Sequence, residues 1–468
     1  MLATRGYTPD TISQYFEGSI VMVKTDVLVI GGSAAGLVSA MTAKSCHPEK
    51  SVTVIRREEK VMIPCGIPYI FGSVGASDNN VLPDAGLVKL GVDIVVDEVL
   101  SIETNEKLCK TTSGEIYSFD KLILATGSEP AVPSWLKGKD LSGVFSIPKN
   151  KAYLDELQHQ LEDCRNIVTV GAGFIGIEMS DELNKDGKAV TLVEILPHVL
   201  GTAFDDEFAA AAEDKLTERG ISLKTGVGIK EVLGSKKVEG VLLDNGQMIE
   251  ADAVILSLGY RPNTTLADEA GLELDKYGFI QVDQYGRTSA NDVFAAGDCS
   301  SKKDFATGKP STIMLASTAC AEARVAALNL FRLSTVTTFR GTIGIYSTNI
   351  GELSLGVAGL TEDTARKEGF DVVTASFTGI DRHPGGLSGA QKQTVKLIVS
   401  KDNGVVLGGE AMGGSSVGEL TNVLGFIIQN SMTLNDLLVA QIGTQPMLTA
   451  SPAGYPLIKA AELAAKQL

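Results

Sequence analysis

The sequence has few of the residues that would build a metal site or a disulfide framework. Its four histidines are accompanied by six scattered cysteines, and no two of the cysteines form a Cys-X-X-Cys pair. A chain of 468 residues does not need disulfides to stabilise a core, so free thiols and a reducing, cytoplasmic setting are expected. No spacing typical of zinc ligands is present, and no metal is expected. The cysteines are Cys46, Cys65, Cys109, Cys164, Cys299 and Cys320.

Positive charge is also in deficit. The chain carries 57 acidic and 41 basic residues, a formal net charge of −16. Nucleic acids and anionic lipid surfaces both bind basic faces, so neither is expected as a partner. No long apolar run suits a membrane span, and Asp10 and Glu17 interrupt the N-terminal segment where a secretory signal would lie. Residues 1–21 are therefore expected to be an extension outside the fold.

Apolar side chains and glycine, in contrast, are plentiful. Hydrophobic residues make up 44% of the chain and charged residues 21%, which is typical of a globular protein. The length predicts two or three domains. The 50 glycines exceed average usage, and they predict many tight turns or places where the backbone closely approaches a ligand.

One pattern of strand, glycine loop and helix occurs twice. Residues 26–36 (DVLVIGGSAAG) and residues 167–176 (IVTVGAGFIG) each join an apolar run to a glycine loop, and a helical segment follows each. The first glycine permits a tight turn, small residues let the backbone approach a pyrophosphate, and the last glycine lets the helix pack on the strand. Because both copies have this context, two dinucleotide sites are predicted.

The strands that follow the two loops distinguish the two ligands. Residues 189–193 (AVTLV) end at Glu194, which can accept both hydroxyls of an adenosine ribose and repel a 2′-phosphate. No arginine follows closely, so NADH is expected rather than NADPH. In the first copy, the strand at residues 51–55 is followed by Arg-Arg-Glu-Glu at 56–59, where one acid is expected. Either Glu58 or Arg56 could serve the adenosine, and this alternative stays open.

Three further segments carry a family resemblance: residues 120–130 (DKLILATGSEP), 253–263 (AVILSLGYRPN) and 288–299 (TSANDVFAAGDC). With the two glycine loops, they make the chain from Met22 onward resemble the pyridine nucleotide–disulfide oxidoreductases. The resemblance implies an α/β fold with two Rossmann-like domains, one for FAD and one for NAD, a C-terminal α+β dimerisation domain, and a homodimer. The implied division is 22–148 and 273–334 for the FAD domain, 149–272 for the NAD domain and 335–468 for the dimerisation domain.

The resemblance also assigns residues to the two cofactors. Gly297 is expected to give access to the flavin and Asp298 to hydrogen-bond a ribitol hydroxyl, although such an aspartate can also be a simple helix N-cap. The other residues expected to bind FAD or the nicotinamide nucleotide lie mostly in the loops described above: Gly31, Ser33, Ala34, Ala35, Gly36, Ala125, Thr126, Gly127, Gly171, Gly173, Phe174, Ile175, Gly176, Glu178, Gly259, Leu315 and Ala316.

Residues 61–72 (VMIPCGIPYIFG) resemble the active-site loop of the family's single-cysteine branch. That branch includes CoA-disulfide reductases, NADH oxidases, NADH peroxidases, and persulfide or polysulfide reductases. Residues 66–72 contain no second cysteine, so Cys65 is expected to act alone through a mixed disulfide, a persulfide or a sulfenic acid. We expect Cys65 to open a helix, whose N-terminus, together with a nearby flavin, would favour the thiolate.

Several positions depart from these relatives. Ala34 stands where NADH peroxidases place a histidine, which disfavours peroxidase activity. CoA-disulfide reductases tend to have a basic pair where this chain has Lys-Ser at 44–45, and paired tyrosines where it has Gly-Leu at 386–387. A dedicated CoA pocket is therefore disfavoured. Gln445 replaces the acid–base histidine that disulfide reductases receive from the partner chain. Tyr455 could substitute for it, or could be an interface tyrosine.

The resemblance implies an oxidoreductase that takes hydride from NADH onto FAD and passes electrons to Cys65. The expected substrate is a small disulfide, persulfide or polysulfide, and a sulfurtransferase-type carrier is a candidate partner. An NADH oxidase that reduces O2 would use the same loop, and this alternative stays open. A non-catalytic flavoprotein redox sensor is a third reading. A ferredoxin-like partner is disfavoured, because the corresponding reductases have no use for a cysteine beside the flavin.

Overall fold

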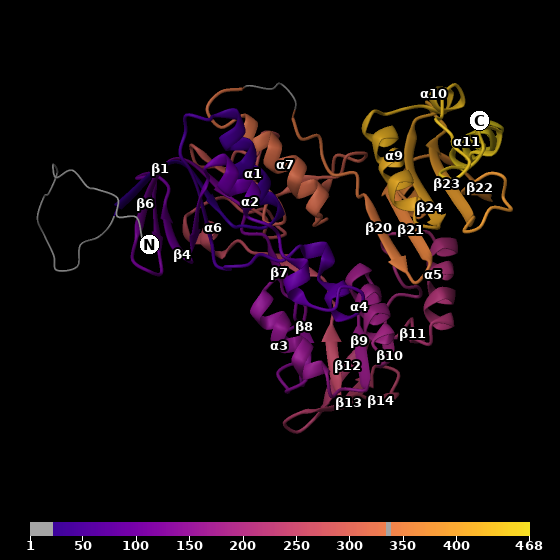
Figure 1. The fold of residues 1–468 in the computed structure, drawn as a ribbon, viewed down its shortest axis with the longest axis horizontal. Coiled ribbons are helices and arrows are strands. Elements are labelled where there is room, and N and C mark those ends of the chain that lie inside the picture. The colour runs from indigo at the N-terminus through magenta and orange to yellow at the C-terminus, as the bar shows by residue number, and fades with distance from the viewer. Residues whose placement is uncertain (1–21, 334–337) are drawn as a thin grey trace, which may run out of the picture.

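The computed structural model describes residues 22–333 and 338–468, so the predicted N-terminal extension lies outside the described residues. Figure 1 shows three bodies: one domain at the left, a second below the centre and the C-terminal domain at the right. Two domains have parallel sheets, and the third has an antiparallel sheet with helices. The predicted α/β fold with a C-terminal α+β domain is confirmed.

The first domain is built on a seven-stranded sheet with a parallel core. Its strands, in spatial order, are β3 (Asp93–Val96), β2 (Val52–Arg56), β1 (Met22–Ile30), β6 (Ile116–Leu124), β5 (Leu108–Thr111) and β4 (Val99–Glu103), with β17 (Val293–Ala295) beside β6. Because β2, β1, β6 and β17 run parallel, the loops that follow them meet at one edge of the sheet. The helices are α1 (Ala34–Cys46), α2 (Ala85–Leu90), α6 (Thr265–Glu269) and α7 (Ala316–Leu328), and short strands β18 (Lys302–Lys303) and β19 (Pro310–Ser311) pair separately.

The second domain repeats this plan. Its parallel sheet has the order β11 (Ser222–Lys224), β10 (Ala189–Val193), β9 (Asn166–Val170), β15 (Ala253–Leu256) and β8 (Val144–Ser146). A second sheet holds β12 (Ile229–Gly234), β13 (Val238–Leu243) and β14 (Met248–Glu250), and the helices are α3 (Lys151–Leu161), α4 (Phe174–Lys185) and α5 (Asp206–Glu218). Where the chain crosses between the domains, β7 (Ser128–Pro130) pairs with β16 (Tyr260–Pro262).

The chain passes from one domain to the other a few residues before each of the two divisions predicted from the sequence. Strand β8 already belongs to the second sheet, although it precedes residue 149. Helix α6 packs in the core of the first domain, where Ala267 and Leu272 share a cluster with Leu122. The full domain boundaries stay a prediction, but these contacts assign β8 to the second domain and α6 to the first.

The C-terminal domain is a five-stranded antiparallel sheet covered by helices. The strand order is β20 (Tyr346–Ile350), β21 (Leu353–Gly359), β24 (Val406–Gly413), β23 (Lys392–Ser400) and β22 (Val372–Ile380). The helices are α8 (Glu362–Lys367), α9 (Val417–Gln429), α10 (Leu434–Leu438) and α11 (Pro456–Ala465). Leu424 and Leu457 bring α9 and α11 into one apolar core with Leu397 of the sheet.

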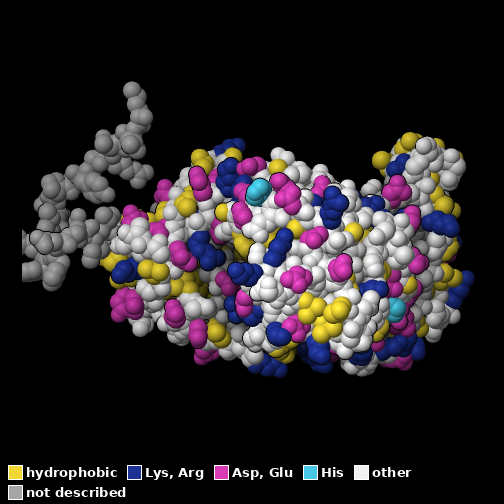
Figure 2. Space-filling view, turned by 90° about the horizontal axis from the view of Figure 1, so that it is seen from below, with side chains coloured by type: hydrophobic (Ala, Val, Ile, Leu, Met, Phe, Trp, Pro, Cys, Tyr) yellow, Lys and Arg dark blue, Asp and Glu magenta, His cyan; other side chains and the backbone are white. Residues whose placement is uncertain are grey.

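The surface mixes charges of both signs. Figure 2 shows Lys and Arg side chains interspersed with Asp and Glu over the face seen from below. Within residues 22–333 and 338–468, no helix is both long and apolar enough to cross a membrane. The same residues contain no group of three or more His, Cys, Asp or Glu side chains that could hold a metal ion.

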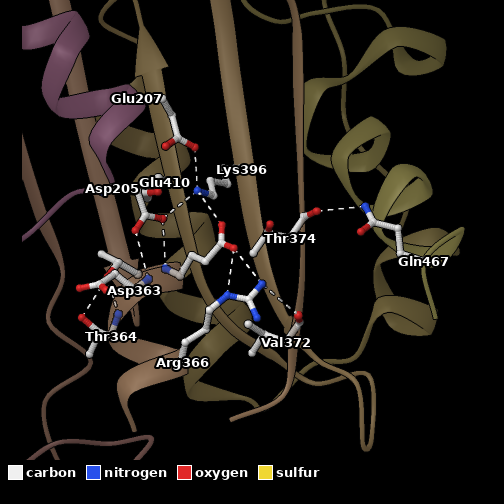
Figure 3. A network of polar contacts seen from close by, with 12 residues as sticks. Asp205, Glu207, Asp363, Thr364, Arg366, Val372, Thr374, Lys396, Glu410 and Gln467 are labelled. Carbon is white, nitrogen blue, oxygen red and sulfur yellow. Dashed lines mark hydrogen bonds and ion pairs between the residues drawn. The ribbon is translucent and has the colours of Figure 1, made fainter. Parts of the chain in front are cut away.

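A buried lysine joins the second domain to the C-terminal domain (Figure 3). The Nζ atom of Lys396, on β23, lies 2.9 Å from Asp205 and 2.6 Å from Glu207, both at the start of α5. It also lies 3.1 Å from Glu362, the first residue of α8. Glu410 on β24 is fully buried and accepts a 2.8 Å hydrogen bond from the Asp205 N–H. Burial and the negative charge of Asp205 raise the pKa of Glu410 to about 9.

We predict that Glu410→Gln stabilises the protein increasingly as the pH rises. The carboxyl ionises near pH 4.5 in the unfolded chain but stays neutral up to about pH 9 in the fold. The wild-type free energy of unfolding therefore falls with rising pH across this window, by at most about 1.4 kcal/mol per pH unit, and glutamine lacks this dependence. Urea unfolding of both proteins at several pH values measures the difference. A difference that stays constant with pH would contradict the prediction.

Candidate active site

A cleft of about 1340 Å³ lies where the three domains meet. The first domain contributes the loops after β1, β6 and β17 and the start of α7. The second domain contributes the start of α4, and the C-terminal domain contributes the start of β20. Most residues predicted to bind cofactors line this cleft: Gly31, Ser33, Ala34, Ala35, Arg56, Glu58, Ala125, Thr126, Gly127, Gly173, Phe174, Ile175, Glu178, Gly259, Asp298, Leu315 and Ala316.

The remaining predicted glycines do not line the cleft, but they allow the close backbone packing that forms the loops. A Cβ on Gly36 would lie 1.9 Å from the carbonyl oxygen of Gly31, and one on Gly176 would lie 1.8 Å from that of Gly171. The last glycine of each loop is therefore required for close packing of helix and strand, as predicted. Gly297 has a positive φ of 87°, and a Cβ there would lie 2.9 Å from Ala35.

The cleft fits two long, polar cofactors. Gly127, Gly173 and Gly259 line it, and a Cβ on any of them would meet no protein atom within 4 Å, so their backbone is open to a ligand. Two polar side-chain atoms at the cleft, Arg56 Nε and Ser257 Oγ, are buried without a hydrogen-bond partner among the described residues. Size, bare backbone and unsatisfied polar atoms agree with the predicted FAD and NAD sites.

Asp298 is held by two neighbours in the cleft. Its Oδ2 atom accepts hydrogen bonds from Ser128 Oγ at 2.7 Å and Lys149 Nζ at 2.8 Å. Burial opposes ionisation of Asp298, but the Lys149 ammonium, the Ser128 hydroxyl and the charge of Lys302 together outweigh it and hold the pKa of Asp298 below its ordinary value. Sequence reasoning missed Lys149, because it follows β8 outside any motif and reaches Asp298 only in the folded chain.

Cys65 opens onto the cleft, but not from the helix that was predicted. It lies in a three-residue 3-10 turn, Pro64–Gly66, followed by a second 3-10 turn, Pro68–Phe71. An α-helix is prevented because Pro68 has no N–H to donate to the Pro64 carbonyl. The expected thiolate stabilisation by a helix N-terminus is therefore wrong. The cleft walls raise the pKa of the Cys65 thiol by burial, and the charge of Glu178 raises it further.

Glu178 is a half-buried acid, and its charge affects the pKa of Cys65 more than any other charge does. Its Oε1 atom accepts a 2.8 Å hydrogen bond from Thr348 of β20, and its carboxyl lies near the Tyr69 hydroxyl. Burial raises the pKa of Glu178 to about 7, although both hydroxyl groups act in the opposite direction. The charge of the cleft therefore changes near neutral pH.

The residues predicted to bind the adenosine groups differ in whether their side chains already have close partners. The Arg56 guanidinium is held by both oxygens of Asp84 at 2.6 Å, whereas Glu58 lines the cleft without so close a pair. Their roles stay predictions. Glu194 lies outside the cleft lining and accepts hydrogen bonds from the N–H groups of Ala172 at 2.6 Å and Leu196 at 2.9 Å. Its carboxylate is thus fixed beside the second glycine loop.

Gln445 and Tyr455 lie in the C-terminal domain and do not line the cleft of their own chain. Gln445 is exposed, and its Oε1 atom accepts a 2.7 Å hydrogen bond from the Met447 N–H. Tyr455 packs against the core of the C-terminal domain, and burial raises the pKa of its phenol. Their predicted acid–base roles depend on a partner chain and stay predictions.

Comparison with known proteins agrees with this geometry. A family model described as pyridine nucleotide-disulphide oxidoreductase matches residues 25–323, and the model of that family's dimerisation domain matches residues 345–453. An NADH oxidase from Methanocaldococcus jannaschii is 30% identical over 94% of this chain and 99% of its own length. An NAD(P)H sulfur oxidoreductase (CoA-dependent) from Pyrococcus abyssi is 31% identical over 94% of this chain and 98% of its own.

A solved structure of an NAD-dependent persulfide reductase from A. fulgidus superposes with a TM-score of 0.87 at 29% identity, covering 94% of this chain and 83% of that one. The predicted family, the predicted cofactors and the predicted oxidoreductase class are confirmed. With its two glycine loops, its shared cleft and these matches along its length, the chain belongs to the pyridine nucleotide-disulphide oxidoreductase family and is an oxidoreductase that uses FAD and NAD(P)H.

Proposed function

We propose that this oxidoreductase uses NADH to reduce the sulfur–sulfur bond of a small disulfide, persulfide or polysulfide, with Cys65 as the nucleophile. The observation that carries the proposal is the place of Cys65. Of the cysteines in the described part of the chain, it alone lines the cleft that the two nucleotide loops share. The sulfur chemistry named for the P. abyssi and A. fulgidus proteins supports the same substrate class.

Different residues of the cleft would bind the two cofactors and react with the substrate. The loop after β1 and Asp298 would hold FAD, and the loop after β9 would hold the nicotinamide nucleotide. Bound FAD would supply the transfer of two electrons between the nicotinamide and the sulfur. The Cys65 thiolate attacks one sulfur of R–S–S–R′, so a bond between Cys65 and R–S forms, the original bond breaks and R′–S⁻ leaves. Reductive cleavage of the new disulfide restores the Cys65 thiolate and releases R–SH, and a proton from solvent converts R′–S⁻ to R′–SH, so that one NADH and one proton are consumed per substrate.

The test is NADH consumption by the purified holoenzyme without oxygen, with polysulfide or CoA persulfide added. We expect turnover that depends on the sulfur compound and releases thiol or sulfide in proportion to the NADH consumed. No turnover until air is admitted would reject the sulfur reductase.

The second candidate is an NADH oxidase that reduces O2. It is favoured by the M. jannaschii relative, which carries that name and matches nearly the full chain. Cys65 would then cycle between thiolate and sulfenic acid. Oxygen uptake that accounts for all NADH consumed, and is not diverted by added polysulfide, would support this function instead.

Glu194 is expected to set the preference for NADH. In Glu194→Ala combined with Ile195→Arg, a carboxylate that repels the 2′-phosphate of NADPH is lost and a cation is placed at an exposed neighbour. We expect the ratio of kcat/KM for NADH over NADPH to fall about tenfold to a hundredfold. Steady-state kinetics with both nucleotides measures this ratio. The matched control is Ile195→Ala, which is expected to leave the ratio nearly unchanged.

We also propose a homodimer, which the match of the C-terminal domain to a dimerisation domain supports. That domain exposes large apolar side chains, among them Phe426 at 67%, Leu448 at 71% and Val439 at 80%. Sedimentation would give the oligomeric state. A sulfurtransferase-type carrier remains part of the proposal, and a pull-down that recovers no sulfurtransferase would count against it.

A further inference from the structure

The segment that carries Cys65 packs on the second domain, although it is encoded within the first. Ile67, Ile70 and Phe71 lie in one apolar cluster with Ile177 and Leu183 of α4. All three follow the cysteine: Ile67 joins the two 3-10 turns, and Ile70 and Phe71 lie on the second turn. The segment that follows Cys65 is therefore anchored on α4 as well as on its own domain.

Glu182 of α4 makes the polar part of this contact. Its side chain is 1% exposed, its Oε2 atom accepts a 2.5 Å hydrogen bond from the Ser73 N–H, and its Oε1 atom accepts one of 3.0 Å from Ser73 Oγ. Lys185, one turn on, places its Nζ 2.6 Å from Glu182 and 3.3 Å from Ser73 Oγ. Gly72 makes room for the carboxylate, since a Cβ there would lie 2.6 Å from Oε2.

The same helix reaches the nucleotide side of the cleft. Helix α4 begins at Phe174, directly after Gly173 of the second glycine loop, and Glu178 on its next turn lies near the Tyr69 hydroxyl. One turn later Glu182 binds Ser73. The turn between these two anchors is closed by a 2.8 Å hydrogen bond from the Val74 N–H to the Tyr69 carbonyl. One helix thus links the predicted nicotinamide loop to the cysteine segment.

We propose that Glu182 is a positioning residue that fixes the Cys65 segment relative to the second nucleotide loop. This inference rests on the proposed sulfur reduction and specifies what holds its nucleophile in place. The role belongs to the hydrogen bonds to Ser73, because the charge of Glu182 is already paired with Lys185. Since reacting groups must be aligned closely, a small shift of the thiol lowers the rate of the sulfur step without changing how NADH binds.

The test separates the two half-reactions of the holoenzyme carrying Glu182→Ala. We expect the reaction of the NADH-reduced enzyme with polysulfide to slow about tenfold to a hundredfold, whereas the reduction of bound flavin by NADH changes less than about twofold. The rate at which iodoacetamide alkylates Cys65 in the oxidised holoenzyme is expected to change as well, and it reports on the thiol without turnover.

Three further variants provide a rescue, a control and an alternative to Glu182→Ala. Glu182→Gln with Lys185→Gln removes both charges but keeps an oxygen that can accept from the Ser73 N–H, so it is expected to restore most of the sulfur step. Asp186→Asn, at the exposed end of the same helix, is the control and is expected to change neither half-reaction. If Glu182→Ala does not fold, Ser73→Ala carries the test, because it removes the hydrogen bond from Ser73 Oγ to Glu182 and leaves every charge in place.

Equal loss in both half-reactions, or loss in neither, would overturn the positioning role. The outcome is distinguishable from failure of the proposed function. If a protein without the Cys65 thiol still reduces polysulfide, the proposed function fails whatever Glu182→Ala does. If that protein is inactive and Glu182→Ala leaves the sulfur step unchanged, only the positioning role fails.

Discussion

Cys65→Ser is expected to lower anaerobic NADH turnover with polysulfide by about a thousandfold or more. The serine hydroxyl keeps the shape of the site, but it is a far weaker acid than a thiol and forms no disulfide with the substrate. Reduction of bound flavin by NADH is expected to stay within about twofold of wild type, because that transfer does not use the thiol. Stopped-flow flavin absorbance and steady-state NADH consumption measure the two rates.

Cys320→Ser is the matched control. Cys320 lies on α7 near the cleft, half-buried and outside the lining, so the same substitution there is expected to leave turnover nearly unchanged. A Cys65→Ser protein that retains more than about a tenth of the wild-type rate would rule out the thiol as the obligatory nucleophile.

Lys396→Met is expected to lower the free energy of unfolding by about 3–5 kcal/mol. The methionine fills the space of the lysine stem but removes the one ammonium that Asp205, Glu207 and Glu362 share. Asp205 is only 6% exposed and lies beside buried Glu410, so its charge is left uncompensated between two domains. Urea unfolding at constant pH measures the loss, and the network is shown in Figure 3.

The control for this prediction is an exposed ion pair of the same domain. Lys401 is 44% exposed and lies 2.7 Å from Asp371. Because solvent screens such a pair, Lys401→Met is expected to cost about 0–1 kcal/mol. If the two variants lose equal stability, the buried network contributes no more than a surface ion pair does.

The family and its cofactors could be predicted from the sequence because their signals are local. Each glycine loop lies between the strand and the helix that it joins, so Gly31 to Gly36 and Gly171 to Gly176 carry the whole motif in adjacent residues. Cys65 could be chosen for the same reason, since its loop is one continuous segment. The helix predicted at Cys65 was wrong because Pro68 has no N–H to donate. Pro68 is visible in the sequence, but the prediction followed the family resemblance instead.

Only the tertiary structure decided which distant residues meet. Lys149 reaches Asp298, Glu178 reaches Tyr69 and Thr348, and Glu182 reaches Ser73, each across a domain or sheet boundary. No periodicity links such pairs in sequence, because packing of separate elements brings them together. The sequence by itself determined the two nucleotide folds and singled out Cys65, because their signals lie in short segments. The charges around that thiol and the packing of its segment on α4 were decided by long-range contacts.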